Sequence, residues 1–145
     1  MIPPVIASGS PLHASCVAVD GKGLLILGPS GAGKSALALA LIAFGADLVA
    51  DDQTMLLVKD GALIARCPAP LVGLIEARGV GLLSVPSVAA ARVVLVADLG
   101  QREDQRLPPL RKVTILGCSL NLLWHADSSH FPAALLLYLR HKRWA

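Results

Sequence analysis

Short apolar runs, separated by glycine, proline and polar residues, recur along the chain, and this pattern predicts more strands than helices. Asp-Gly pairs near residues 20 and 60 predict hairpin turns over 20–23 and 59–61. Gly79 and Gly81 indicate a constrained turn, and 100–109 is predicted to be a polar loop. The predicted strands cover residues 16–19, 24–27, 47–50, 54–58, 62–67, 93–97 and 113–116.

Two segments carry helical patterns. Residues 34–44 are rich in alanine and leucine and precede Gly45, a typical C-cap, and residues 129–142 form the second predicted helix. Because hairpins interrupt the alternation of strands and helices, we expect an α/β fold with a mixed β-sheet and helices packed on it. A chain of 145 residues without a repeat or linker predicts one domain, 1–145.

Composition excludes several classes of protein. Hydrophobic residues make up 54% and charged residues 16%, which is too apolar for a disordered chain. The longest late apolar run, 113–126, is shorter than the ~20 residues of a membrane-spanning helix. The apolar excess therefore favours an oligomer interface and no membrane association.

Charge and cysteine content point to a cytoplasmic protein without a nucleic-acid partner. The net charge is only +3 and aromatic residues are 3%, whereas single-strand binders combine positive charge with stacking rings. The N-terminus lacks the basic start of a secretory signal. Three widely spaced cysteines suit reduced thiols in a core better than a disulfide framework or a zinc site.

The strongest motif is a complete Walker A sequence between a predicted strand and a predicted helix. Its glycines allow successive backbone N–H groups to point at phosphate oxygens, and the helix N-terminus favours anions. Its lysine is expected to bind the β and γ phosphates of ATP, and its serine to bind Mg²⁺. The motif consists of Gly28, Pro29, Ser30, Gly31, Ala32, Gly33, Lys34 and Ser35.

Mg²⁺ and phosphoryl transfer also require carboxylates, and two interpretations compete. Asp98 ends the apolar run VVLVAD in the manner of a Walker B aspartate, which suits a small-molecule kinase or ATPase. Asp51 and Asp52 follow another apolar strand, and adjacent residues of an extended segment point opposite ways, so that one faces the phosphate. Glu76 is a further acidic candidate.

A lone histidine is more often structural than catalytic, but His13 precedes the strand before the Walker A hairpin. That position is expected to bring its ring to the sheet edge that carries Asp51 and Asp52, where it orients a carboxylate or shares its proton. The other three histidines have no such argument. A guanine-binding NKxD sequence is absent, which disfavours a GTPase of the Ras type.

Together, the upstream histidine, GPSGAGKS, LVADD and IEARGVGLLSVP resemble the catalytic domain of HPr kinase/phosphorylase, which acts on a serine of the phosphocarrier protein HPr. The resemblance implies a fold related to phosphoenolpyruvate carboxykinase, regulation of the phosphotransferase system, and usually a hexamer. It also implies that Ser35 and Glu76 serve Mg²⁺ and that Lys34 binds phosphates. His13 would assist the acidic pair, with Asp52 favoured over Asp51 as the base, and Arg78 lies in the family's signature stretch.

The sequence departs from the family in two places. No counterpart of the usual N-terminal domain is visible, as in a short proteobacterial form. Family members also carry a Gly-Arg-Asn segment, but the corresponding residues 116–121 contain no arginine, which puts reverse phosphorolysis in question. Arg111 or Lys112 is a candidate substitute. The leading hypothesis is an HPr serine kinase; the alternatives are the kinase or ATPase with Asp98 and a module that senses ATP without turnover.

Overall fold

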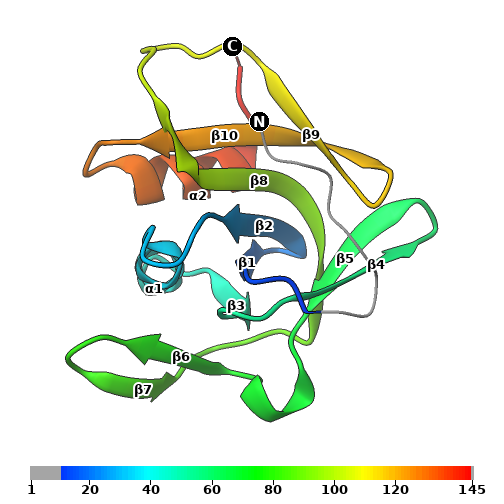
Figure 1. The fold of residues 1–145 in the computed structure, drawn as a ribbon, viewed down its shortest axis with the longest axis vertical. Coiled ribbons are helices and arrows are strands. Elements are labelled where there is room, and N and C mark those ends of the chain that lie inside the picture. Colours follow the sequence, from blue (N-terminus) through cyan, green and yellow to red (C-terminus); the bar gives the residue numbers. More distant parts are fainter. Residues whose placement is uncertain (1–10, 145) are drawn as a thin grey trace.

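A computed structural model describes residues 11–144, which form one large mixed sheet, two helices and a small separate hairpin (Figure 1). The sheet follows the order β3-β1-β2-β8-β10-β9, and the β4–β5 hairpin joins it where β5 pairs with β8. The sheet strands are β1 (Ser15–Val19), β2 (Lys22–Leu27), β3 (Asp47–Ala50), β4 (Met55–Lys59), β5 (Ala62–Arg66), β8 (Ala90–Glu103), β9 (Arg111–Ile115) and β10 (Cys118–Ala126).

The remaining elements are the helices α1 (Lys34–Ala43) and α2 (Phe131–His141), the 3₁₀ turn η1 (Ala69–Leu71), and the small hairpin of β6 (Leu74–Ala77) and β7 (Gly81–Ser84). Only β2, β8 and β10 run parallel to one another, at the centre of the sheet, and the other pairings are antiparallel. Because α1 follows β2 directly, the loop between them leaves the carboxyl end of a central parallel strand. Ligand sites in α/β sheets commonly occupy this position.

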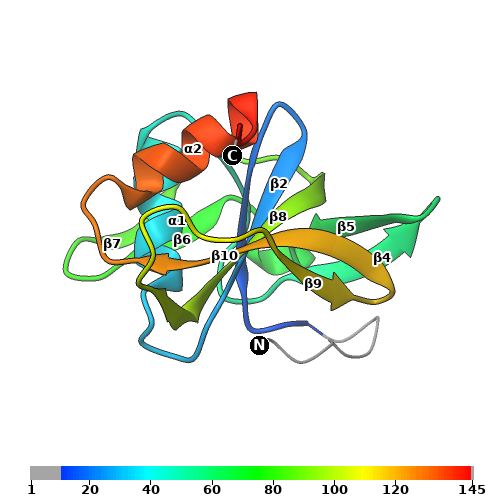
Figure 2. The ribbon, with the colours of Figure 1, turned by 90° about the horizontal axis from the view of Figure 1, so that it is seen from above.

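The two faces of the sheet carry separate hydrophobic cores. Both helices pack on one face, where Leu37 and Leu41 of α1 and Leu135 of α2 meet side chains such as Leu95. The β4–β5 hairpin contributes Leu56, Leu63 and Ala65 to the core of the other face. Figure 2 shows the helices on one side of β2 and β8 and this hairpin on the other. Burial on both faces explains why the central strands are almost purely apolar.

Most predicted elements are confirmed. The strand 47–50 is found with the predicted limits, the predicted hairpins over 20–23 and 59–61 are present, and the constrained turn with Gly79 and Gly81 is the β6–β7 turn. The two predicted helices begin or end one to two residues from the observed limits. In residues 11–144, no helix is long and apolar enough to cross a membrane.

Two predictions near the C-terminal half are wrong. The polar loop predicted over 100–109 begins later, because β8 continues to Glu103 and its polar end pairs with β10. The prediction also missed β10, which follows β9 after a two-residue turn at Leu116 and Gly117. Leu116 has a φ of 47°, a conformation that leucine rarely adopts, so this turn carries no usual sequence signal.

Candidate active site

The Walker A residues form a loop that joins β2 to α1 and has three glycines in conformations unfavourable to other residues. Gly28, Gly31 and Gly33 have φ values of 151°, 84° and 100°. At Gly28 a Cβ atom would lie 3.2 Å from the Cβ atoms of Ala32 and Leu99, so a side chain there would also crowd its neighbours. The curl of the loop therefore favours glycine at all three positions, and close packing favours it further at Gly28.

Lys34 begins α1, and its side chain turns back over the loop. Its Nζ donates hydrogen bonds to the carbonyl oxygens of Gly28, at 2.8 Å, and Pro29, at 3.1 Å. The residue is only 6% exposed. A buried ammonium group is thus held against the backbone of the loop, where it can exchange these carbonyls for phosphate oxygens.

Asp51, directly after β3, connects the acidic pair to the Walker A loop. Its Oδ1 accepts a hydrogen bond of 2.7 Å from the hydroxyl of Ser35 and another of 3.0 Å from the hydroxyl of Ser15. The helix start and the end of β3 are thereby brought together across the face of the sheet. The carboxylate and the Ser35 hydroxyl are oxygen donors of the kind that Mg²⁺ takes from proteins.

Asp52 points the other way, toward His13, whose Nε2 lies 2.5 Å from its Oδ1. The two side chains diverge because the backbone bends at Asp52, and not because of strand alternation. Asp52 has a φ of 66°, and the N–H of Gln53 donates to the carbonyl of Asp51 at 2.7 Å. This is the hydrogen bond of a three-residue γ-turn. Strained backbone of this kind is common at functional sites.

Backbone pairing explains how His13 reaches the acidic pair. Leu12 and Thr54 form an isolated antiparallel bridge, with N–H to carbonyl distances of 2.8 and 2.9 Å in the two directions. The Thr54 hydroxyl also donates to the carbonyl of Ala14 at 2.8 Å. The segment before β1 is therefore fixed beside the segment after Asp52, which places the imidazole against that carboxylate.

Sequence reasoning missed Ser15, which lies fully buried at the start of β1. Its hydroxyl donates to Asp51 Oδ1 and accepts the backbone N–H of Asp52 at 3.2 Å, so one side chain orients both members of the acidic pair. A serine before an apolar strand carries no signal of this role. The pairing of β1 with β3 reveals it only in three dimensions.

Glu76 and Arg78 lie on the β6–β7 hairpin, beside α1 (Figure 1), and both are exposed. Ile75 anchors this hairpin in the core with Leu37 and Leu41. Within residues 11–144, neither Glu76 nor Arg78 makes a hydrogen bond or ion pair with the loop or the acidic pair. Their roles toward metal and substrate stay predictions. Among the described residues, no three His, Cys, Asp or Glu side chains gather as a metal site.

Asp98 also lies near the Walker A loop, since it pairs with Leu27, the residue before Gly28. Its carboxylate is turned to its own strand, where Oδ1 accepts the N–H of Gly100 at 2.8 Å. The hydrogen bond to Ser35 comes from Asp51 and not from Asp98. The geometry thus favours Asp51 over Asp98 as the Walker B-like partner of the loop.

Arg111, one candidate substitute for the arginine of the family's Gly-Arg-Asn segment, already forms an ion pair with Glu103. Its guanidinium donates to both carboxylate oxygens of Glu103 at 3.1 Å and lies 3.6 Å from the ring centre of Trp124. The pair is largely buried, with 18% and 7% of the two side chains exposed. Use of Arg111 as a phosphate ligand would require breaking this contact, whereas Lys112 is exposed.

The cysteines differ from the prediction of three core thiols. All three are free, but only Cys16 is buried, and burial raises its pKa to about 12. Cys67 is half-buried, and its pKa is raised first by partial burial and second by the negative charge of Asp51. Cys118 is half-buried on β10. The pKa of Cys67 therefore depends on the charge of Asp51.

We expect Asp51→Asn to make Cys67 react faster with iodoacetamide near pH 8. The thiolate is the reactive form, and removal of the Asp51 charge lowers the pKa of Cys67, so a larger fraction is ionised at that pH. Alkylation rates across a pH series, measured in a Cys118→Ser background, test this. An Asp104→Asn control should leave the rate unchanged, and an unchanged profile in Asp51→Asn would contradict the assigned cause.

Comparison with known proteins decides the family. The profile of the HPr Serine kinase C-terminal domain matches residues 5–98, which include the loop, the acidic pair and the β6–β7 hairpin. The chain belongs to this family. A solved structure of the Hpr(Ser) kinase/phosphatase from Coxiella burnetii superposes on the chain with a TM-score of 0.75 and 28% identity, over 90% of this chain and 93% of that one. The mixed sheet with packed helices is therefore confirmed as the family fold.

Curated relatives in the HPr kinase family extend the sequence match. The HPr kinase/phosphorylase of Clostridium beijerinckii is 45% identical over 83 residues, which cover 57% of this chain and 28% of the relative. That of Burkholderia lata is 35% identical over 133 residues, covering 77% of this chain and 41% of the relative. The chain thus spans less than half the length of these two relatives.

Proposed function

We propose that the chain is an ATP-dependent serine kinase of the phosphocarrier protein HPr, acting in regulation of the phosphotransferase system. The observation that carries the proposal is the hydrogen bond of 2.7 Å between Ser35 and Asp51, which joins the Walker A loop to the acidic pair. Membership of the HPr Serine kinase C-terminal domain family and the printed names of its relatives support the choice of protein substrate.

The first step is binding of the triphosphate of ATP by the loop. The backbone N–H groups around the glycines and the ammonium of Lys34 neutralise the phosphate oxygens. Ser35 and Asp51 would hold Mg²⁺, with Glu76 as the further ligand that the resemblance implies. When bound, Mg²⁺ neutralises negative charge on the transferring phosphate. Positioning and charge neutralisation supply most of the catalysis in such reactions.

The second step is proton transfer from the attacking serine hydroxyl. We assign the base to Asp52, because Asp51 accepts hydrogen bonds from two serine hydroxyls. The Asp52 side chain is 62% exposed, and its carboxylate pairs only with His13 among residues 11–144. His13 orients this carboxylate and, when protonated, shares the charge. As the serine oxygen forms its bond to the γ phosphorus, ADP leaves and Asp52 takes the proton. Arg78 is exposed in the turn of the β6–β7 hairpin, and we propose that it contributes to the reaction, as its place in the family's signature stretch implies.

A single assay tests the proposal. The chain is incubated with Mg²⁺, ATP labelled at the γ phosphate and purified HPr, beside an HPr variant that lacks the target serine. We expect label in the first HPr only. ATP hydrolysis without label in HPr would favour the small-molecule kinase or ATPase, and ATP binding with neither product would favour the sensing module. Either result would overturn the proposal.

We also infer that the chain assembles into a homo-oligomer, because the resemblance to the family implies a hexamer. Large apolar side chains are exposed on and around the β6–β7 hairpin, where Val80 is 76%, Leu82 66% and Val72 50% exposed. Apolar residues gathered on one projecting hairpin favour contact with a partner. We expect the wild type to sediment as an assembly and Leu82→Glu to sediment as a monomer. A wild-type monomer would contradict the inference.

A further inference from the structure

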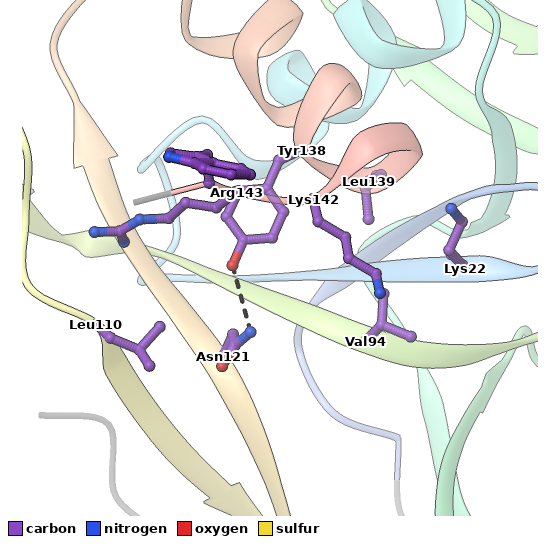
Figure 3. Close-up of a pocket in the computed structure, with 9 residues that line it drawn as sticks. Lys22, Val94, Leu110, Asn121, Tyr138, Leu139, Lys142 and Arg143 are labelled. Atoms are coloured by element: carbon purple, nitrogen blue, oxygen red, sulfur yellow. Dashed lines mark hydrogen bonds between the residues drawn. The ribbon is translucent and has the colours of Figure 1, made fainter.

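A pocket of about 500 Å³ lies beneath the C-terminal end of α2 and opens between this helix, β8, β10 and the segment before β9 (Figure 3). Its apolar wall includes Val94, Leu110, Leu139 and the ring of Tyr138. This volume is in the range of sites for small molecules. The proposed function makes no use of the pocket.

The pocket is separate from the Walker A loop. It includes Lys22, the first residue of β2, whereas the loop follows Leu27 at the other end of that strand. Six strand residues place these two ends roughly 15–17 Å apart, given the rise per residue of a strand. A molecule in the pocket therefore does not occupy the phosphate site.

All charged side chains that line the pocket are positive. They are Lys22, Lys142 and Arg143. Arg143 donates to the carbonyl of Pro108, and Lys22 to that of Arg140 at 3.4 Å. Within the described chain Lys142 makes no side-chain hydrogen bond or ion pair, and Figure 3 shows it extending over the pocket toward Val94. Three cations without a lining carboxylate favour an anionic occupant.

The wall of the pocket also contains an unsatisfied acceptor. Asn121 on β10 donates from Nδ2 to the hydroxyl of Tyr138 at 3.4 Å, as the dashed line in Figure 3 shows. Its Oδ1 is buried and has no hydrogen-bond partner among residues 11–144. Buried polar atoms are nearly always paired, so this oxygen calls for a donor.

We propose that this pocket binds a small organic anion with an apolar, preferably aromatic, body. The body packs on Tyr138 and the aliphatic wall, and the anionic group lies near Lys142 and Lys22. The two features are complementary in one molecule, because apolar packing supplies affinity while the cations fix its orientation.

Two dyes test this proposal on the full chain. Anilinonaphthalene sulfonate carries an aromatic body, an N–H donor and one anionic group, and phenylnaphthylamine is its counterpart without the sulfonate. We expect one molecule of the sulfonate dye to bind per chain. Its affinity should be about tenfold higher than that of the neutral dye, a difference of the size that one well-placed charge pair would give. Saturating Mg²⁺ and ATP should not displace it. Displacement, or equal affinities for the two dyes, would overturn the proposal.

Variants locate the bound dye. The double variant Lys22→Gln/Lys142→Gln should abolish the preference for the sulfonate dye, whereas Lys59→Gln/Arg66→Gln, which removes two exposed cations from the β4–β5 hairpin, should retain it. Leu110→Trp should weaken both dyes, and because Leu110 is 62% exposed this variant is expected to fold. An unchanged preference in the first variant, or equal loss in the control, would place the dye elsewhere and reject the site.

Discussion

Replacing Lys34 by alanine is expected to lower the rate of HPr phosphorylation by at least about 10²–10³-fold, the usual effect of removing a group that stabilises developing charge. Lys34 is 6% exposed, and its ammonium group lies within hydrogen-bonding distance of two carbonyl oxygens of the loop. It is therefore fixed where the phosphates are proposed to bind. Water cannot substitute for it, because a water molecule brings no net charge.

Lys34→Met separates catalysis from folding. Methionine keeps the apolar stem that packs at the start of α1 but lacks the charge, so we expect a similar loss of activity with an unchanged thermal unfolding temperature. Transfer of γ-labelled phosphate to HPr gives the rate. Lys59→Ala, at an exposed position in the β4–β5 hairpin, is the matched control and should keep full activity. Normal HPr labelling by a folded Lys34→Met variant would reject the assignment of Lys34.

The Walker A loop was predictable because its information is local. Glycine spacing, the Lys-Ser ending and the flanking strand and helix all lie within one short stretch of sequence. The structure places residues 28–33 between β2 and α1, and Lys34 and Ser35 begin α1. The acidic pair was also visible after an apolar strand. Sequence also predicted that its two side chains point opposite ways, but from strand alternation. The γ-turn around Asp52 that separates them was not predictable, because it depends on a positive φ that sequence does not specify.

Contacts between distant segments account for what sequence did not reveal. Ser15 orients the acidic pair across 36 residues of chain, and the Arg111–Glu103–Trp124 contact joins three strands or strand ends. The polar end of β8 reads as a loop by composition but is kept extended by pairing with β10. At this end of β8, tertiary pairing overrides local preference, as is common for strands.

Comparison of three aspartate-to-asparagine variants is expected to separate the proposed base from the proposed metal ligand. Asp52→Asn should lower kcat for HPr phosphorylation by about 10²–10⁴-fold, the contribution of a positioned general base, with little change in ATP affinity. The amide keeps the shape of the side chain and tolerates the left-handed φ of 66°, so the turn should persist. Its nitrogen cannot accept the serine proton.

Asp51→Asn should produce a different pattern. This carboxylate is bound to Ser35, so loss of its charge is expected to weaken Mg²⁺ binding, and activity should recover in part when the Mg²⁺ concentration is raised. Asp52→Asn should show no such recovery. Initial rates measured over a Mg²⁺ series therefore distinguish a residue that holds the metal from one that takes the proton.

Asp98→Asn should remain active to within a few-fold, because Oδ1 of an asparagine can still accept the N–H of Gly100 and thus preserve the bond that turns this side chain away from Ser35. Asp104→Asn, at an exposed site, controls for loss of one negative charge. The decisive contrary result is an inactive Asp98→Asn beside an active Asp52→Asn. That outcome would transfer the Walker B role to β8 and leave the His13–Asp52 pair as a structural contact.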